Sequence, residues 1–394
     1  MEIGVDATCW WNRRGFGRFT RELIKAMLAA PRGHRFCLFT DRPPEPEMTG
    51  PHVRVVQVPV MRPVTTAAVA DGRRSLRDVW LFGRAAAAEP LDVMFFPAVY
   101  SWFPVPRRTP SAITLHDAIA EHYPELIFPD RKGRFFWWLK MRLARHWARR
   151  VLTVSEAARE EIVAYAGVRR NIIDVICEGA DPRFRPVADP ARRAAVRAAA
   201  RLPPRPARLI LYVGAVAPHK NLPNFVRGFA EALRQPGLED LHLAISGDPG
   251  GDGFHSSHAT LVRQVESEPV LRGRVHFTGF VSDDDLPALY SDALATTLPS
   301  LSEGFGLPVL ESMACGTPVL VSRTGAAPEV AGAGGLTFDP LDPAAIARQI
   351  RIAAAEPATW EGLRTAALAR ARHYTWERAA ELALVSLEAC AGRP

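Results

Sequence analysis

The chain has few cysteines, no long apolar run and no low-complexity segment, and each absence excludes a class of protein. The five cysteines are scattered, odd in number and without metal-ligand spacing, so a disulfide framework is not expected and the reducing cytosol fits best. No run of about 18 apolar residues is present, which argues against a membrane-spanning helix. The opening residues, MEIGVDATCWW, are expected to form a strand rather than a signal peptide.

The composition is that of an ordinary globular protein with a basic balance. The 394 residues are 48% hydrophobic and 23% charged, and this length favours two or three domains with sizeable cores. Lysine and arginine number 49 against 42 acidic residues, and the net charge of +7 permits nucleotide diphosphates, anionic lipid or nucleic acid as partners. No recognised nucleic-acid module accompanies this charge, so nucleic acid is not an expected partner.

Apolar, strand-like segments alternate with segments of helical periodicity in both halves of the chain, which favours an α/β fold with parallel, doubly wound sheets. The expected strands are Ile3–Val5, Phe36–Phe39, Val53–Val58, Val93–Phe96, Ala112–Leu115 and Val151–Val154, then Leu209–Val213, Leu243–Ser246, Val275–Thr278, Ala293–Thr297 and Val319–Ser322. The expected helices include Arg18–Ala30, Arg131–Arg150 and Glu156–Ala166.

Proline-rich stretches at Asp181–Asp189 and Arg201–Pro206 separate the two series of strands. We therefore expect one domain over residues 1–199 and a second over 200–373. Residues 374–394 follow as an amphipathic helix.

An acidic, glycine-rich turn lies in SEGFGLPVLESMACGTPVLVS, residues 302–322. Glu303 precedes Gly304–Gly306, where bare backbone N–H groups can approach an anion closely. Pro308 opens a helix, so the turn presents N–H groups at a helix N-terminus, a site for phosphate or sugar oxygen. Glu311 lies about one turn inside that helix. Two carboxylates are thus expected to face one pocket, and the alternative is a surface turn with two solvated glutamates.

This segment resembles the Glu-x7-Glu signature of the retaining GT-B glycosyltransferases of the family-4 type. The resemblance rests on both glutamates, Gly-Phe-Gly, the proline and the Ala-x-Gly-x-Pro-Val that follows. It implies the GT-B fold, in which two Rossmann-like doubly wound domains face each other across a cleft and the C-terminal helix crosses back to the first domain. The catalytic residues that it implies are His116, Glu303 and Lys220.

The segment LYVGAVAPHKNL also matches a Gly-x5-Lys element of the same family, with Gly214, Lys220 and the following Asn221 as donor-site residues. A lysine at the carboxyl end of a strand can reach a diphosphate as a point charge. One position departs from the family pattern, since many relatives carry arginine after the glycine and this chain has Ala215. Either His219 or Arg18 supplies the second cation, or the diphosphate is held more loosely.

The resemblance assigns further donor contacts. The glycine-rich loop after the first strand contributes Gly15, Gly17 and Arg18, although Gly-x-Gly alone equally predicts a plain tight turn. Base and ribose contacts are expected from Gly247 and Asp248 and from Gly279 to Val281. The amides of Phe305, Gly306 and Leu307 would help to position the donor sugar, and Glu311 would accept hydrogen bonds from the ribose hydroxyls.

The segment Arg131–Arg150 leaves two interpretations open. At 100° per residue, five arginines (131, 134, 142, 145 and 149) fall on one stripe with Trp138, beside an apolar face of Phe135, Phe136, Leu139, Leu143 and Trp147. Such a helix can lie in a membrane interface. Alternatively, the apolar face packs on the sheet and the basic face is solvated.

These observations predict a retaining hexosyltransferase that uses a nucleotide-diphosphate sugar, with GDP-mannose as first guess. The acceptor would be a saccharide or a polyprenyl-linked saccharide of bacterial surface-polysaccharide or glycolipid synthesis. No acidic metal motif is present, and neither a metal nor another cofactor is expected. The expected location is the cytoplasm, at the inner face of the plasma membrane if the helix binds lipid. The alternatives are a non-catalytic sugar-nucleotide-binding subunit and a GT-B nucleotide-sugar epimerase.

Overall fold

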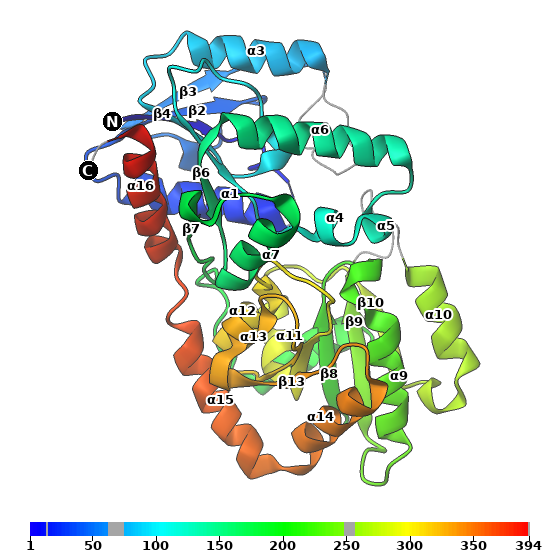
Figure 1. Ribbon diagram of the computed structural model, residues 1–394. Coiled ribbons are helices and arrows are strands. Elements are labelled where there is room, and N and C mark those ends of the chain that lie inside the picture. The colour runs from blue at the N-terminus through cyan, green and yellow to red at the C-terminus, as the bar shows by residue number, and fades with distance from the viewer. Residues whose placement is uncertain (13–14, 62–74, 248–256, 393–394) are drawn as a thin grey trace. The chain divides into compact units, whose positions relative to one another are not determined.

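The computed structural model describes residues 1–12, 15–61, 75–247 and 257–392 (Figure 1). The chain divides into two compact units, Met1–Gly179 with Thr375–Pro394, and Ala180–Tyr374. The predicted boundary near residue 200 differs from this division, because residues 180–199 pack on the second unit. Phe184 and Val196 are part of its hydrophobic core, and the helix α8 (Pro190–Ala199) packs on α11 (Leu286–Asp292).

The first unit has a seven-stranded sheet in the order β3-β2-β1-β4-β5-β6-β7, and every recorded pairing is parallel. Its strands are β1 (Glu2–Asp6), β2 (Arg35–Thr40), β3 (Val53–Gln57), β4 (Val93–Phe96), β5 (Ser111–Thr114), β6 (Ala148–Thr153) and β7 (Ile173–Val175). The central strands β4 and β5 are buried at every residue, as parallel strands covered on both faces require.

The helices of the first unit are α1 (Gly15–Ala29), α3 (Leu76–Ala87), α4 (Ile119–His122), α5 (Pro124–Ile127), α6 (Arg131–Trp147), α7 (Glu156–Ala166) and α16 (Trp376–Ala391). The C-terminal helix α16 packs against α1 (Figure 1). Polar contacts fix this helix as well, since Ser386 Oγ donates to Asp174 Oδ2 at 2.6 Å and His34 Nε2 lies 2.9 Å from Glu388 Oε1. Residues from the two ends of the first unit therefore form one core.

The second unit has a six-stranded sheet in the order β10-β9-β8-β11-β12-β13, again with parallel pairings. Its strands are β8 (Arg208–Val213), β9 (Leu241–Ser246), β10 (Val275–Gly279), β11 (Ala295–Leu298), β12 (Val319–Ser322) and β13 (Gly335–Phe338). The strand order reverses between β8 and β11, so the loops after these two strands flank the point where doubly wound sheets bind ligands.

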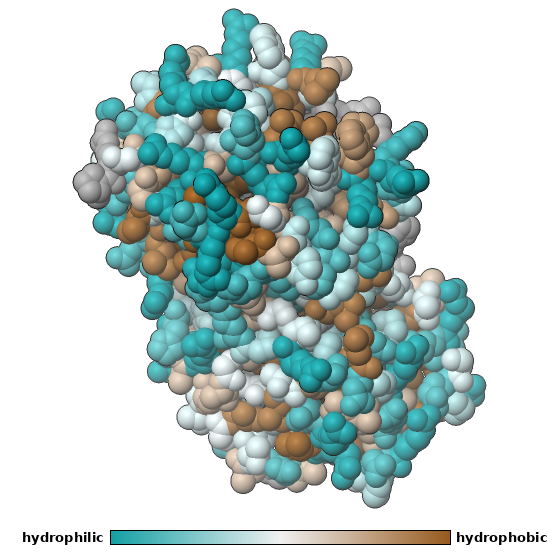
Figure 2. All heavy atoms as spheres, viewed as in Figure 1, coloured by the Kyte–Doolittle hydropathy of each residue, from teal (hydrophilic) through white to brown (hydrophobic). Residues whose placement is uncertain are grey.

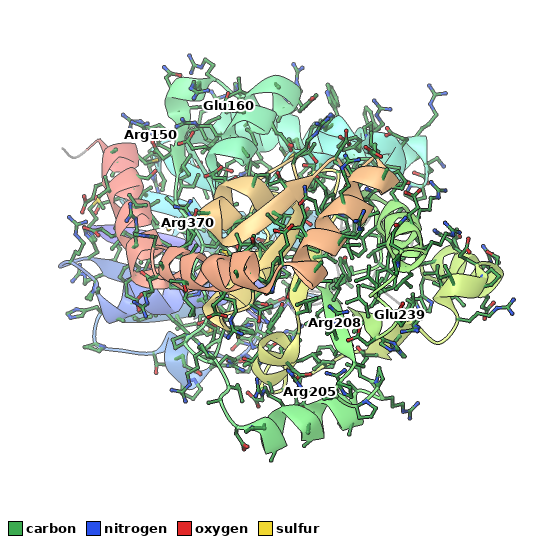
Figure 3. All side chains as sticks on the ribbon, turned by 90° about the horizontal axis from the view of Figure 1, so that it is seen from below. Arg150, Glu160, Arg205, Arg208, Glu239 and Arg370 are labelled. Carbon is green, nitrogen blue, oxygen red and sulfur yellow. The ribbon has the colours of Figure 1, made fainter. Side chains whose placement is uncertain are left out.

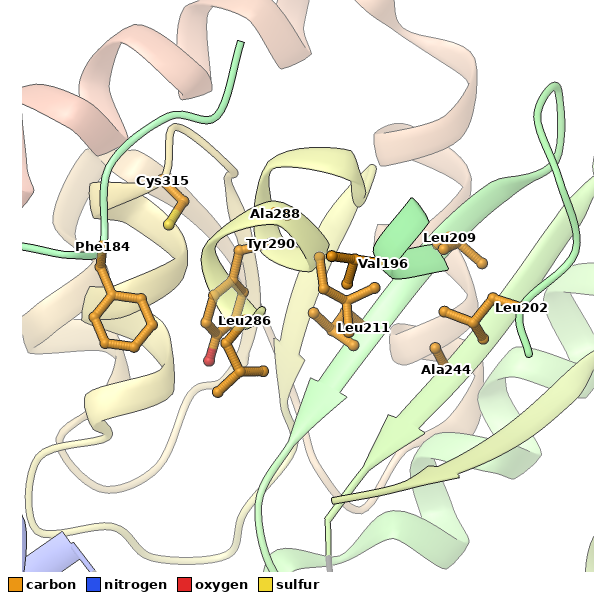
Figure 4. Close-up of a cluster of buried hydrophobic side chains, with 11 residues drawn as sticks. Phe184, Val196, Leu202, Leu209, Leu211, Ala244, Leu286, Ala288, Tyr290 and Cys315 are labelled. Atoms are coloured by element: carbon orange, nitrogen blue, oxygen red, sulfur yellow. The ribbon is translucent and has the colours of Figure 1, made fainter. Parts of the chain in front are cut away.

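The remaining helices of the second unit are α9 (Leu222–Leu233), α10 (His258–Ser267), α12 (Leu307–Ala314), α13 (Ala327–Ala331), α14 (Pro343–Ala355) and α15 (Pro357–Ala371). Between α8, α11 and the sheet lies the hydrophobic cluster of Figure 4, which includes Leu209, Leu211 and Tyr290. Arg370 of α15, labelled in Figure 3, donates to the Glu329 carbonyl at 2.7 Å and so joins α15 to α13.

The predicted α/β fold is confirmed, and each predicted strand overlaps an observed one. The short strands β7 and β13 were not predicted, and the predicted helix from Arg131 ends at Trp147 because Ala148 already pairs with Ser111 in the sheet.

Helix α6 also buries a different stripe from the one expected. Gly133, Trp137, Met141 and Ala144 are buried, whereas Phe135, Phe136, Trp138, Leu139 and Leu143 are 36–54% exposed. The interpretation that the predicted apolar face packs on the sheet is therefore wrong. Figure 2 shows hydrophobic residues interspersed with hydrophilic ones over α6. Within the described residues, no helix combines the length and hydropathy that a membrane span requires.

A buried ion pair joins α8 to the end of α11. The side chains of Arg197 and Asp292 are both 3% exposed, and Arg197 Nη1 lies 2.6 Å from Asp292 Oδ2. The second carboxylate oxygen accepts from Arg205, labelled in Figure 3, at 2.7 Å. Because the guanidinium of Arg197 is buried, its charge depends on Asp292 for compensation.

We predict that Asp292→Ala lowers the free energy of unfolding by about 3 kcal/mol, because it leaves a buried guanidinium unpaired. Urea denaturation followed by circular dichroism measures this loss. Asp284→Ala is the matched control, since that carboxylate is 85% exposed and pairs with the exposed Arg183. Equal midpoints for the two variants would contradict the role given to the buried pair.

Candidate functional site

Lys220 and Glu303 meet at the point where the strand order of the second unit reverses. Lys220 ends a short 3-10 helix after β8, and Glu303 lies in the loop between β11 and α12. Lys220 Nζ donates to Glu303 Oε1 at 2.6 Å, and Ser300 Oγ donates to the same oxygen at 2.6 Å. The two predicted catalytic residues of this unit are thus in direct contact, at the place where the fold collects its loops.

The carboxylate of Glu303 is held in its charged form. Burial alone would raise the pKa of this group, but the charge of Lys220 and the hydrogen bonds from Lys220 and Ser300 together outweigh burial and lower the pKa. Glu303 therefore presents an ionised acceptor, with Oε2 outside these two bonds. Ionised carboxylates of this kind orient hydroxyl groups by accepting their hydrogen bonds.

The surroundings of His219 disfavour the charged form that a second cation would need. Its side chain is buried, and burial together with the charge of Lys220 lowers its pKa to about 4. The imidazole is consequently neutral near pH 7. His219 and Arg18 were the two residues considered as a substitute for the arginine that many relatives carry at position 215. Of these two, Arg18 is the one with a charged side chain at neutral pH.

Glycines let the backbone chains of neighbouring strands approach closely beside this pair. A Cβ on Gly247 would lie 2.0 Å from the Gly214 carbonyl oxygen, and Gly214 has φ +148°, so neither position accepts a side chain without a shift. Gly247 donates its N–H to the Gly279 carbonyl at 3.0 Å. Tyr212 donates its hydroxyl to the Ala215 carbonyl at 2.7 Å, which fixes the loop that leads to Lys220.

Asn221 has a structural task that the sequence did not indicate. Its backbone is left-handed (φ 56°), and its side-chain amide donates to the carbonyls of Pro299 (3.2 Å) and Pro340 (2.7 Å). The residue thereby ties the loop after β8 to the loops after β11 and β13. Contact between Asn221 and a donor stays a prediction.

The turn after Glu303 leads directly into α12, as predicted. Gly306 precedes the helix with φ +94°, a left-handed conformation that glycine adopts most readily, and Leu307 is the first helical residue. Phe305 is buried and meets the ring of Tyr374 edge-on at 5.4 Å. Leu307 and Gly306 thus place their amides at the helix N-terminus, where the partial positive charge of the dipole favours anions.

Glu311 is 2% exposed and lies inside the fold, where Tyr290 donates its hydroxyl to Glu311 Oε2 at 3.0 Å. The ring of Tyr290 belongs to the hydrophobic cluster of Figure 4, so the core holds this hydroxyl in place. Val281 packs on the same cluster. Its packing gives Val281 a role in the core, and its contact with a base stays a prediction.

In the first unit, His116 follows the carboxyl end of β5. Its Nε2 donates to the Pro97 carbonyl after β4 at 3.0 Å, and its Nδ1 lies 3.8 Å from the carboxylate of Glu178. The ring of Phe19 packs edge-on against the imidazole at 4.6 Å. These contacts fix the orientation of His116, and the partner Glu178 was not identified from the sequence.

The glycine-rich loop after β1 is described only in part. Gly15, Gly17 and Arg18 lie in the first turn of α1, and a Cβ on Gly17 would lie 2.1 Å from the Asn12 carbonyl oxygen. Close packing of the chain on itself therefore requires glycine at position 17, whether or not a ligand binds. Asp248 lies outside the described residues.

The predicted site residues thus form two groups, one in each unit. Ser300, Tyr290 and Glu178 were missed because each acts by holding another polar residue. Ser300 stands three residues before Glu303, a spacing typical of side-chain bonds in turns, and offered the one local clue. Among the described residues, no three His, Cys, Asp or Glu side chains are grouped as metal ligands would be. The expectation of a metal-free reaction stays a prediction.

Comparison with protein families assigns both units. Residues 13–184 match the family described as "Glycosyltransferase Family 4", and residues 198–370 match "Glycosyl transferases group 1". The chain belongs to the glycosyltransferases that combine these two domains. The two matched regions correspond closely to the two Rossmann-like units of the structure, and the GT-B fold class predicted from the sequence is confirmed.

Several curated relatives of this glycosyltransferase are similar over part of their length. The O-antigen chain mannosyltransferase B of Escherichia coli is 36% identical over 171 residues, 42% of each chain. The serotype-specific mannosyltransferase WbdA of Escherichia coli is 29% identical over 272 residues, which are 68% of this chain and 32% of that protein. A D-inositol 3-phosphate glycosyltransferase of Rhodococcus opacus is 30% identical over 59% of this chain and 51% of that protein. The chain thus spans at most about half the length of these relatives.

Solved structures of similar fold cover nearly the whole glycosyltransferase. The sucrose-phosphate synthase of Thermosynechococcus elongatus has a TM-score of 0.74 at 22% identity and covers 100% of both chains. HepE of Anabaena, solved in complex with UDP-glucose, has a TM-score of 0.71 at 19% identity and covers 98% of this chain and 99% of that one. At these identities, the likeness establishes the fold.

We predict that Lys220→Met raises the pKa of His219 above its value of about 4, because the substitution removes a nearby positive charge that disfavours the imidazolium. A pH titration of the imidazole signals by NMR measures the change. Lys25→Met, on the exterior of the first unit, is the control and leaves this titration as it is. An unchanged His219 pKa in Lys220→Met would mean that Lys220 does not lie beside His219 in solution.

Proposed function

We propose that the protein is a retaining glycosyltransferase that moves a hexose from a nucleotide-diphosphate sugar to a saccharide or lipid-linked acceptor. The observation that carries the proposal is the contact between Lys220 and the ionised Glu303 at the strand-order reversal of the second unit. One cation and one anion there match the two halves of such a donor. Diphosphate oxygens suit the cation, and sugar hydroxyls suit the anion.

Departure of the nucleotide is the step that most needs electrostatic help. Lys220 and the amides at the start of α12 would stabilise the negative charge that develops on the leaving diphosphate. Glu303 would accept hydrogen bonds from the donor sugar and hold its anomeric carbon toward the acceptor. The acceptor oxygen would attack the same face that the nucleotide leaves, and its proton would pass to a phosphate oxygen.

His116 would contribute from the first unit by contacting the donor sugar or the acceptor hydroxyl. Its Nε2–H is engaged by the Pro97 carbonyl and its Nδ1 lies 3.8 Å from the carboxylate of Glu178, so the ring would be held in a fixed orientation for this contact. Glu311 would accept from the ribose hydroxyls, with Tyr290 as the group that holds its carboxylate.

GDP-mannose is the donor that we propose first. Two of the curated relatives are mannosyltransferases by name, and one of them is 36% identical to this chain over 171 residues. The acceptor would belong to surface-polysaccharide or glycolipid synthesis, as the name of the O-antigen relative suggests.

We further propose that the exposed face of α6 binds anionic membrane lipid. This face is defined by Phe135, Phe136, Trp138, Leu139 and Leu143. Exposed arginines of the same helix accompany it, among them Arg131, Arg134 and Arg142. Aromatic side chains favour the bilayer interface, while guanidinium groups favour anionic headgroups. A lipid-linked acceptor would be presented at this surface.

The purified protein is offered UDP-, GDP-, ADP- and dTDP-sugars in separate reactions. We expect it to release nucleotide slowly from GDP-mannose, and more rapidly once an acceptor is added. Glu303→Ala and Lys220→Ala would each lower this release by about a hundredfold, a loss typical of removing one preorganised electrostatic contact. Chromatography of the free nucleotide measures the rate. Arg351→Ala, an exposed change elsewhere in the second unit, is the control.

The same assay separates the alternatives. Conversion of the donor to an epimeric nucleotide sugar without nucleotide release would indicate an epimerase. Calorimetric binding of a nucleotide sugar without any turnover would indicate a binding subunit. If the chain neither binds nor hydrolyses any of the donors, the transferase proposal is wrong.

For the membrane surface, we predict that Phe135→Ser with Trp138→Ser weakens binding to vesicles containing phosphatidylglycerol by at least about tenfold, because two exposed aromatic side chains lose their burial in the bilayer. Co-sedimentation measures the bound fraction. Leu76→Ser, which alters a residue that is 87% exposed on α3, is the control and should bind as the unaltered chain does. Equal binding by both variants would exclude the α6 face.

A further inference from the structure

A basic depression lies at the end of α6, away from the residues assigned to the donor. It has a volume of about 550 Å³ and is lined by Arg107, Arg108, Thr109, Pro110, His146, Trp147, Ala148 and Arg149. We call it the arginine depression. Its lining comes from the loop before β5, the last turn of α6 and the start of β6.

The arginine depression opens at the amino edge of the sheet. Ser111 and Ala148, the first residues of β5 and β6, pair with each other beside it. His116 follows the opposite end of β5, so roughly 10 Å of strand separates the two places. A ligand in the depression therefore does not occupy the site built around His116.

The described partners of the arginines in the depression are an aromatic ring, an imidazole nitrogen and a backbone carbonyl, all of them uncharged groups or lone pairs. Arg107 lies over the ring of Trp147 at 5.6 Å and donates to His146 Nε2 at 3.3 Å. Trp147 is itself fixed, since its Nε1 donates to the Val105 carbonyl at 3.1 Å. Arg108 donates to the Ala87 carbonyl at 3.1 Å.

The arginines of the depression have no carboxylate partner among the residues that the structure describes. Within the described ranges, none of the arginines at positions 107, 108 and 149 forms an ion pair with a carboxylate. The C-terminus of α6 can favour a nearby cation through the helix dipole, but that effect is small and falls off within one turn. It does not explain why the loop before β5 adds two further arginines.

We propose that the arginine depression binds a phosphate monoester or diphosphate group. Guanidinium groups present paired N–H donors that match phosphate oxygens, and several of them converge on a concavity of the size that small ligands occupy. The phosphate can be carried by a lipid headgroup or by a soluble molecule. In either case the phosphate group of the ligand binds in the arginine depression, and the ligand is a different molecule from the nucleotide-sugar donor.

The test is a calorimetric titration with inorganic pyrophosphate of four forms of the full chain. These are the unaltered chain, the double variant Arg107→Ala/Arg108→Ala, the single variant Lys220→Ala, and the double variant Arg77→Ala/Arg351→Ala. The last form removes the same charge from exposed positions elsewhere. Circular dichroism verifies that each form is folded, which is expected because Arg107 and Arg108 are exposed.

We expect the Arg107/Arg108 variant to lose one class of pyrophosphate binding, with at least tenfold weaker affinity, while the Lys220 and Arg77/Arg351 variants retain that class. An Arg107/Arg108 variant with the affinity of the unaltered chain would overturn the proposal, as would loss of all binding in Lys220→Ala. Because the proposed donor site is tested separately by Lys220→Ala, failure of either site leaves the other identifiable.

Vesicles distinguish the source of the phosphate. If phosphatidic acid vesicles displace pyrophosphate from the Lys220→Ala protein and phosphatidylcholine vesicles do not, the depression takes a lipid phosphate. If pyrophosphate binds and neither vesicle displaces it, the depression takes a soluble phosphate. Displacement by phosphatidylcholine as effective as by phosphatidic acid would contradict phosphate recognition.

Discussion

The ion pair between Lys220 and Glu303 is the interaction on which the proposed chemistry depends. It joins the loops that follow β8 and β11, the two strands on either side of the reversal in strand order. Burial makes an unpaired charge costly, so the lysine keeps the carboxylate ionised and the carboxylate in turn fixes the lysine. Ser300 stabilises this pair by donating a hydrogen bond to Glu303. The glycines after β8 and β9 allow the backbone segments of the two strands to approach each other closely.

The two proposals place phosphate groups at two separate sites, one in each unit of the chain. The second unit offers a single lysine and a helix N-terminus, with alanine at position 215 and a neutral His219 beside them. The first unit adds exposed arginines on α6 and in the arginine depression. The donor diphosphate would thus be held by few charges, while most of the basic excess is available for an anionic surface or a second phosphate.

Much of the fold follows from the sequence, because buried parallel strands are apolar runs and helices carry their own periodicity. β7 and β13 were missed because each is a short edge strand with a single buried residue, and so neither contains an apolar run. Two interpretations of α6 were left open because a helical wheel gives the stripes of a helix but not the stripe that the rest of the fold covers. Glu303 and Lys220 were identified from their local pattern, whereas Glu178 and Tyr290 support His116 and Glu311 across long separations that only the folded chain reveals.

A crystal structure of the protein with GDP-mannose would show whether Lys220 and Glu303 hold the donor. We expect a diphosphate oxygen within about 3 Å of Lys220 Nζ, a hydrogen-bond distance, and a sugar hydroxyl donating to the carboxylate of Glu303. The ribose hydroxyls would approach Glu311. A nucleotide bound with its diphosphate away from Lys220, or found in the arginine depression alone, would contradict the account.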